Sequence, residues 1–191
     1  DLIRNRVLRS TRSRPVTSAL EDIWRSTLED RDDGSCQGPF HSVEEVTEAL
    51  GTDQWVPTQR FEVVQRNKVR GCDSATVNMV NQVTTIVDKL ELPSTDTNVA
   101  ALRMIRTKFD GEVQGWVLDE AKAYRQIAIQ PSHRRFSVIT FRHFETGKLV
   151  FFIMIGHSFG LVAAVYNYNR RSAMIDELLR KEFGLVSFCY Y

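Results

Sequence analysis

The chain has 191 residues, enough for one ordinary domain or for part of a larger one. Its 42% hydrophobic and 26% charged residues are typical of a soluble globular protein, and a net charge of +1 does not by itself indicate a nucleic-acid partner. No apolar run approaches the ~20 residues that cross a bilayer, and the arginine-rich start lacks the apolar core of a secretory signal. The cysteines are widely spaced and form no Cys-x-x-Cys pair. We therefore expect no zinc site, and we expect Cys36, Cys72 and Cys189 to be reduced thiols. Reduced thiols predict an intracellular protein, cytoplasmic or nuclear.

Basic residues gather in two segments despite the balanced total. The first contains Arg4, Arg6, Arg9, Arg12 and Arg14, and the second contains Arg60, Arg66, Lys68 and Arg70. Clusters of this kind neutralise phosphate backbones, and a merely solvated charged face is an equally weighted alternative for either one.

The first half of the chain predicts helices and one hairpin. Residues 17–28 suit a short amphipathic helix, and the acidic, glycine-containing segment 29–39 suits a loop. Ser42 and Glu45 form an S-x-x-E capping box, which predicts a helix over residues 43–50.

Further along, the valine-rich segment 60–72 predicts two short strands joined by a turn. A helix is expected to follow Pro93 and to run to about Lys108, with apolar residues on one face. The apolar residues before Asp119 predict that a strand ends at this carboxylate.

The second half is more strongly patterned. Residues 136–141 and 149–155 predict a hairpin with at least one strand buried on both faces. Helical spacing then continues from Leu161 to Phe183, and residues 185–191 predict a final strand. Strand, hairpin, long helix and strand in this order predict an α+β fold, with helices on one face of an antiparallel sheet.

Asp119 begins the most informative string in the sequence. A single Asp at a strand end is most often a turn former or helix cap. Here it opens the string Asp119-x-x-x-Ala123-Tyr124-Arg125-Gln126-Ile127-x-Ile129-x-Pro131. This string resembles motif A of retroelement reverse transcriptases, the group that includes LTR retrotransposons and retroviruses.

Three further blocks follow the same family order. Phe159-Gly160-Leu161 resembles motif B, and Lys68-x-Arg70-x-x-Asp73, with Asn81 after it, resembles the fingers strand that meets a triphosphate. Phe188-Cys189-Tyr190-Tyr191 resembles the start of motif C, where an aromatic pair precedes two aspartates. Because the sequence stops at Tyr191, we expect this fragment alone to be inactive.

The resemblance covers roughly residues 55–191 and implies a right-hand polymerase fold with an antiparallel palm sheet and a fingers subdomain. It divides the chain into a helical, basic extension of unclear role (1–51), the fingers with their connection to the palm (52–118), and the palm (119–191). The implied activity is RNA-directed DNA polymerisation, in which a dNTP is joined to a primer 3′-hydroxyl on an RNA or DNA template. The implied partners are an RNA template, a DNA primer–template duplex and dNTPs, without a membrane. RNase H and integrase are the further polyprotein domains that this family allows.

Two Mg²⁺ ions, for which Mn²⁺ can substitute, carry the transfer in this family. By the resemblance, the Asp119 carboxylate bridges both ions and the backbone carbonyl of Glu120 adds a ligand. Carboxylate and carbonyl oxygens suit such hard cations. Lys68 and Arg70 balance the triphosphate charge.

The sugar is selected by Tyr124 in the family pattern, because a bulky ring beneath the ribose leaves no space for a 2′-hydroxyl. Phe159 and Gly160 shape the floor under the nucleotide. A core tyrosine is the alternative interpretation of Tyr124, and a glycine turn that opens a helix is compatible with the role of Gly160.

The sequence departs from the family pattern at three positions. Ser158 stands where proline usually precedes Phe-Gly, Gly71 stands where proline is common, and His157 is unusual beside motif B. A degenerate domain that binds nucleic acid without catalysis is therefore an alternative to an active polymerase. A more remote alternative is an unrelated α+β binding protein.

Overall fold

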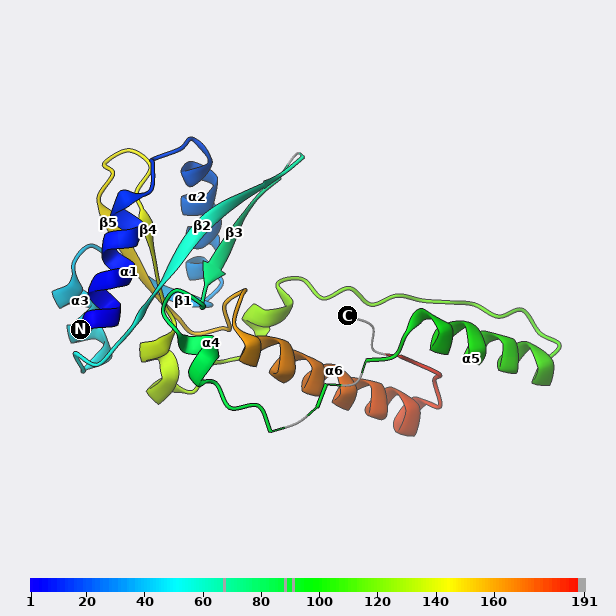
Figure 1. The fold of residues 1–191 in the computed structure, drawn as a ribbon. Coiled ribbons are helices and arrows are strands. Elements are labelled where there is room, and N and C mark those ends of the chain that lie inside the picture. Colours follow the sequence, from blue (N-terminus) through cyan, green and yellow to red (C-terminus); the bar gives the residue numbers. More distant parts are fainter. Residues whose placement is uncertain (67, 88, 91, 189–191) are drawn as a thin grey trace. The chain divides into compact units, whose positions relative to one another are not determined.

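The computed structural model describes residues 1–66, 68–87, 89–90 and 92–188 (Figure 1). The chain forms two compact units, and each is described by itself. Unit 1 comprises residues 1–85 and 124–164, and unit 2 comprises residues 86–123 and 165–191. In the part of the chain that the structure describes, no helix is both long and apolar enough to span a membrane. The predicted extension, fingers and palm boundaries stay a prediction.

Unit 1 is built on a five-stranded sheet in the order β1-β5-β4-β2-β3. The strands are β1 (Cys36–Phe40), β2 (Pro57–Gln65), β3 (Lys68–Ser74), β4 (Val138–Arg142) and β5 (Leu149–Met154). The α+β class is confirmed, but the sheet is mixed, so the prediction of a purely antiparallel sheet is wrong. β2 and β4 run parallel from the Pro57↔Val138 pair onward. Parallel pairing needs a long crossover connection, and the segment between these two strands is long enough to provide one.

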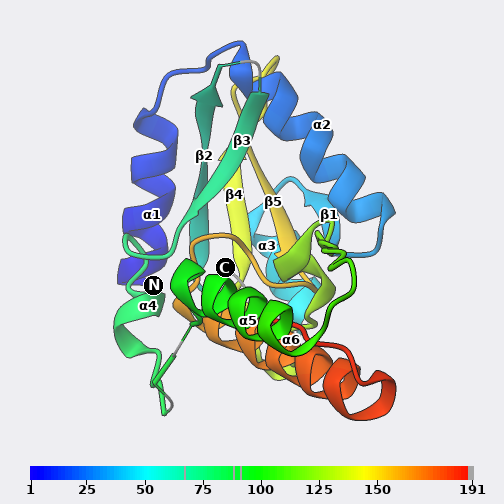
Figure 2. The ribbon, with the colours of Figure 1, turned by 90° about the vertical axis from the view of Figure 1, so that its right-hand side faces the viewer.

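Helices cover both faces of this sheet, so the prediction of helices on one face is also wrong. α2 (Ala19–Asp32) packs through Ile23 on the face that carries Ile139 and Phe152. α1 (Leu2–Ser13) and α3 (Val43–Leu50) pack on the opposite face, as Figure 2 shows for α1 and α2. The cause is the composition of β4 and β5, which direct large apolar side chains to both faces.

Locally encoded elements follow the sequence predictions. The Ser42 hydroxyl accepts a hydrogen bond from the Glu45 amide at 3.1 Å, and α3 has the predicted bounds. β2 with β3 and β4 with β5 form the two predicted hairpins. β5 is buried along Val150–Met154, which confirms a strand buried on both faces.

The segment predicted as a loop between residues 29 and 39 is structured instead. α2 continues to Asp32, and β1 begins at Cys36, which pairs with Met154 of β5. The pairing partner of β1 is more than 100 residues away in the sequence, so local patterns did not reveal this strand. Residues of the predicted extension 1–51 thus supply a strand and three helices to unit 1. Unit 1 also contains α4 (Val80–Val83), the 3₁₀ helices η1 (Ala123–Gln126, all but its first residue) and η2 (Pro131–Phe136), and the first residues of α6 (Val162–Phe183).

Unit 2 contains α5 (Thr95–Lys108) and all but the first turn of α6 (Val162–Phe183), and both helices confirm predictions. The predicted strand before Asp119 is wrong, because residues 116–119 form no strand pairing and Val117 is 94% exposed. Residues 185–188 form no strand either, and Cys189, Tyr190 and Tyr191 lie outside the described residues. Extended segments become strands only when a neighbouring strand satisfies their backbone groups, and neither segment has such a neighbour among the described residues.

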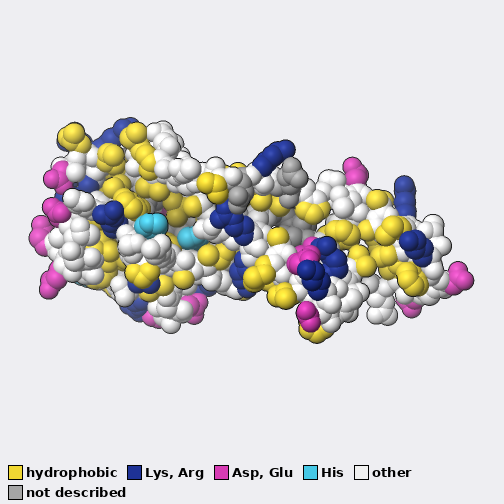
Figure 3. All heavy atoms as spheres, turned by 90° about the horizontal axis from the view of Figure 1, so that it is seen from below, with side chains coloured by type: hydrophobic (Ala, Val, Ile, Leu, Met, Phe, Trp, Pro, Cys, Tyr) yellow, Lys and Arg dark blue, Asp and Glu magenta, His cyan; other side chains and the backbone are white. Residues whose placement is uncertain are grey.

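On the face drawn in Figure 3, hydrophobic side chains are interspersed with charged ones.

Candidate active site

The later part of the Asp119 string, residues 124–129, lies beside the segment that leads into α6. Residues 123–126 form a single 3₁₀ turn that ends in a short antiparallel contact. The Ile129 amide donates to the Ile155 carbonyl at 2.6 Å, and the His157 amide donates to the Ile127 carbonyl at 3.0 Å. These bonds fix the 3₁₀ turn next to residues 157–160.

Tyr124 and Phe159 meet at this point. Tyr124 is 6% exposed, and its ring lies edge-to-face against Phe159 with centroids 5.1 Å apart. Phe159 is 42% exposed and forms the solvent side of the pair. The structure therefore joins two predicted site residues. It also gives Tyr124 a packing contact, and the sugar-selection role stays a prediction.

Gly160 occupies a position that has no space for a side chain. Its φ is +95°, and a Cβ atom there would lie 2.1 Å from the Asp73 carbonyl oxygen. The Asn81 side chain donates to the Gly160 carbonyl at 2.8 Å and accepts from the Val162 amide at 3.0 Å. The segment resembling motif B is thus held by the block that begins at Lys68, which is far away in the sequence.

Lys68 and Arg70 are exposed on β3, opposite Gln65 and Val63 of β2. A strand rises ~3.3 Å per residue, so Arg70 lies about 10 Å along the strand from Asp73. Both cations belong to the strand whose far end contacts Gly160. Lys68, Arg70, Tyr124, Phe159 and Gly160 all belong to unit 1.

A buried ionic network lies next to Phe159 and Gly160, and the sequence patterns did not reveal it. Arg60 Nε and Nη2 donate to the two carboxylate oxygens of Asp73 at 2.7 and 2.9 Å, and both side chains are almost completely buried. Arg60 Nη1 donates to the Thr27 hydroxyl of α2 at 2.9 Å. Burial acts to lower the Arg60 pKa, but the charge and hydrogen bonds of Asp73 outweigh it, and the pKa is raised.

Arg125 forms the second half of the network. Its Nε donates to Asp30 at 3.0 Å, its Nη1 donates to the His157 carbonyl at 2.6 Å, and its guanidinium lies 5.3 Å from the Phe159 ring centre. Burial lowers the Arg125 pKa, and the nearby charge of Arg60 lowers it further. Arg125 therefore links α2, the 3₁₀ turn and the ring of Phe159. In the sequence, the only indication of this buried role was that Arg125 lies in the more apolar second half of the Asp119 string.

Cys36 borders the same network. Burial, followed by the negative charge of Asp30, raises the pKa of its thiol to about 11, and the residue is 3% exposed. Burial also lowers the pKa of His157.

The raised pKa predicts that Cys36 reacts slowly with alkylating agents. At pH 8 a thiol of pKa 11 is about one part in 1,000 thiolate, against about a quarter for an ordinary thiol of pKa 8.5. In a variant with Cys72→Ser and Cys189→Ser, iodoacetamide should modify the folded chain at least ~100-fold more slowly than the chain in urea. Rates within a few-fold of each other in the two states would contradict the burial of this thiol.

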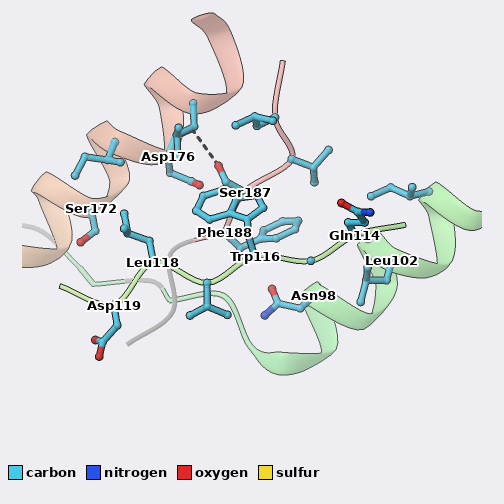
Figure 4. A pocket seen from close by; sticks show the side chains of 18 of the residues that line it. Asn98, Leu102, Gln114, Trp116, Leu118, Asp119, Ser172, Asp176, Ser187 and Phe188 are labelled. Carbon is cyan, nitrogen blue, oxygen red and sulfur yellow. Dashed lines mark hydrogen bonds between the residues drawn. The ribbon is translucent and has the colours of Figure 1, made fainter. Parts of the chain in front are cut away.

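Asp119 and Glu120 lie in unit 2, on the wall of a pocket of about 890 Å³ (Figure 4). The pocket is lined by residues of α5, α6 and the segments 113–120 and 185–188. Asp119 is exposed and makes no hydrogen bond or ion pair with the residues that the structure describes, whereas Glu120 pairs with Arg171 of α6. Within the described ranges, no three side chains of His, Cys, Asp or Glu gather as a metal-ligand group.

Neither a scan against protein-family models nor a search of curated proteins returns a match to this sequence.

Proposed function

We propose that this chain is the fingers and part of the palm of an RNA-directed DNA polymerase of the retroelement reverse-transcriptase type. The observation that carries the proposal is the meeting of three sequence blocks that resemble separate motifs of that family. Tyr124 contacts Phe159, the Asn81 side chain donates a hydrogen bond to the Gly160 carbonyl, and the Asp73 backbone carbonyl packs against Gly160. An unrelated α+β protein has no reason to bring these blocks together, so their contact supports the polymerase over that alternative.

In this proposal, Lys68, Arg70, Tyr124 and Phe159 supply the nucleotide contacts. Tyr124 and Phe159 lie under the sugar, and the ring pair excludes a 2′-hydroxyl by volume. Lys68 and Arg70 pair with the triphosphate, for which the guanidinium fork and the ammonium group are both suited. The Arg125 guanidinium positions Phe159 through a cation–π contact with its ring.

By the family resemblance, Asp119 and Glu120 supply metal ligands. The Asp119 carboxylate is exposed and has no competing cation among the described residues, which fits a group that receives a divalent ion. The Glu120 carbonyl is the second oxygen that the family pattern assigns. Bound Mg²⁺ would supply charge stabilisation for the transferring phosphoryl group.

A degenerate domain that binds nucleic acid without catalysis is the second candidate, and Ser158 favours it. The side chain is 1% exposed, and its hydroxyl has no hydrogen-bond partner in the described part of the chain. A buried unsatisfied hydroxyl costs on the order of 1–3 kcal/mol, and the proline usual at this position would avoid that cost. Such a substitution is expected in a copy that is no longer under selection for activity.

The coding sequence beyond Tyr191 tests the catalytic proposal directly. We expect the next two codons to encode Asp-Asp, because the aromatic pair of motif C precedes the two remaining metal carboxylates. The protein extended through these residues should then add dNTPs to a DNA primer on an RNA template. Two other residues in place of Asp-Asp would overturn catalysis and leave the degenerate nucleic-acid-binding domain.

A further inference from the structure

One exposed face of α1 carries three arginines that make no ion pair with a residue in the described part of the chain. Arg6, Arg9 and Arg12 are exposed, and α1 contains neither Asp nor Glu. At 3.6 residues per turn they lie within an arc of about 120° and span ~9 Å of helix. Val7 and Leu8, on the opposite side, are buried against the sheet. Arg6, Arg9 and Arg12 are called the arginine face below.

The arginine face differs from other charged helix surfaces of this chain. On α2, Arg25 pairs with Glu21 one turn away at 3.1 Å, and on α6, Lys181 pairs with Glu177 at 3.0 Å. No guanidinium of the arginine face makes an ion pair with a described residue. Like charges one turn apart destabilise a helix by ~0.2–0.5 kcal/mol per pair. Solvation alone gives no reason to keep three arginines so close together. A bound anion would offset their mutual repulsion.

The positive surface continues onto the hairpin of β2 and β3. Arg14 follows α1, and its guanidinium lies 5.2 Å from the ring centre of Phe61 in β2. Phe61 lies on the face of the sheet that α1 covers, because β2 residues alternate and Arg60 on the other face bonds to α2. Arg70 and Lys68 pair with Val63 and Gln65 and therefore lie on the same face as Phe61.

We propose that the arginine face of α1 binds the phosphate backbone of a nucleic acid, next to the β2–β3 hairpin that Arg14 contacts. For the identity of the partner, this inference rests on the proposed function; for the site, it rests on the charges and contacts above. Guanidinium groups pair well with phosphate, and a duplex carries one phosphate charge per ~1.7 Å of its axis. An anionic membrane is disfavoured because the apolar side of α1 is buried in unit 1 and is not available for insertion.

Fluorescence anisotropy with a labelled 20-base-pair DNA duplex and a labelled single-stranded RNA, both in EDTA without nucleotide, tests the site. Each arginine that neutralises a phosphate contributes about −0.9 to the slope of log K against log salt for a duplex, and about −0.7 for a single strand. The triple variant Arg6→Gln, Arg9→Gln, Arg12→Gln should therefore reduce the slope by about 2–3. Its affinity in 0.1 M salt should fall on the order of 10- to 100-fold for the preferred nucleic acid. Replacing the same residues by lysine should retain the slope.

The matched control removes three paired cations by the substitutions Arg25→Gln, Arg180→Gln and Lys181→Gln, which change the net charge equally. Its affinity should stay within two-fold of the unmodified chain. Equal losses in both triple variants, or an unchanged slope in the first, would overturn the proposal. Binding to phosphatidylserine vesicles that needs the arginine face, while nucleic-acid binding does not, would assign the face to a membrane instead. Because the assay needs neither metal nor nucleotide, its result is independent of whether Asp-Asp follows Tyr191.

Discussion

Replacing Arg60 by methionine should lower the free energy of unfolding by about 3–5 kcal/mol, since it leaves the buried Asp73 carboxylate without its cation. The lost bonds are the two from Arg60 to Asp73 and the one to the Thr27 hydroxyl. Urea unfolding followed by circular dichroism measures the change. Removing one partner of a buried ion pair is costly because the remaining charge cannot be solvated.

The matched control is Arg25→Met, which removes an exposed arginine from a pair with Glu21. Exposed pairs contribute little, and a change below ~1 kcal/mol is expected. Replacing both members of the buried pair, as Arg60→Met with Asp73→Leu, should recover part of the loss, because no buried charge then remains. If Arg60→Met and Arg25→Met destabilised the chain equally, the network beneath the candidate site would have no special role in stability.

Under the proposed function, replacing Tyr124 by alanine in a protein extended through Asp-Asp should mainly change which sugar is accepted. The ring is held against Phe159 with centroids 5.1 Å apart, and alanine would open that volume to a 2′-hydroxyl. A ribonucleotide that must shift by ~1 Å in the wild type loses on the order of 100-fold in rate. The ratio of ribonucleotide to deoxynucleotide incorporation should therefore rise by up to that factor. Single-nucleotide extension on an RNA template, with each triphosphate in turn, gives the ratio.

Asp119→Asn serves as the comparison, because under the proposed function it removes a metal ligand and leaves Tyr124 and Phe159 unchanged. It should abolish extension with both sugars. If Tyr124→Ala lowered both incorporation rates by the same factor, the ring would be a packing residue, as its burial in unit 1 also allows.

Features of the fold that depend on short sequence separations were predictable. The capping contact between Ser42 and Glu45 spans three residues, and both hairpins join neighbouring strands, so the local pattern determines them. The pairing of Asp30 with Arg125 spans 95 residues, and no periodicity encodes such a partner. The parallel contact of β2 with β4 was missed for the same reason, and with it the mixed sheet.

Some residues of the candidate site were predictable from the sequence and others were not. The resemblance grouped Tyr124, Phe159 and Gly160 by family order, and the structure brings these three together. It did not reveal Arg60 or Arg125 as supports, because buried arginines follow no sequence spacing. The prediction of a strand before Asp119 was wrong for another reason. An apolar run indicates a strand only if a partner edge exists, and the pattern of one segment carries no information about its partner.

The order in which the sheet of unit 1 is made has a consequence during protein synthesis. β1 pairs with β5, and β2 pairs with β4, but the later strand of each pair is synthesised long after the earlier one. At ~5–20 residues per second, β1 waits on the order of 5–20 seconds for its neighbour. During that interval the backbone edge of β1 and the apolar side of α2 are open to other chains. Production of this protein should therefore benefit from added chaperone, which limits encounters between incomplete sheets during that interval.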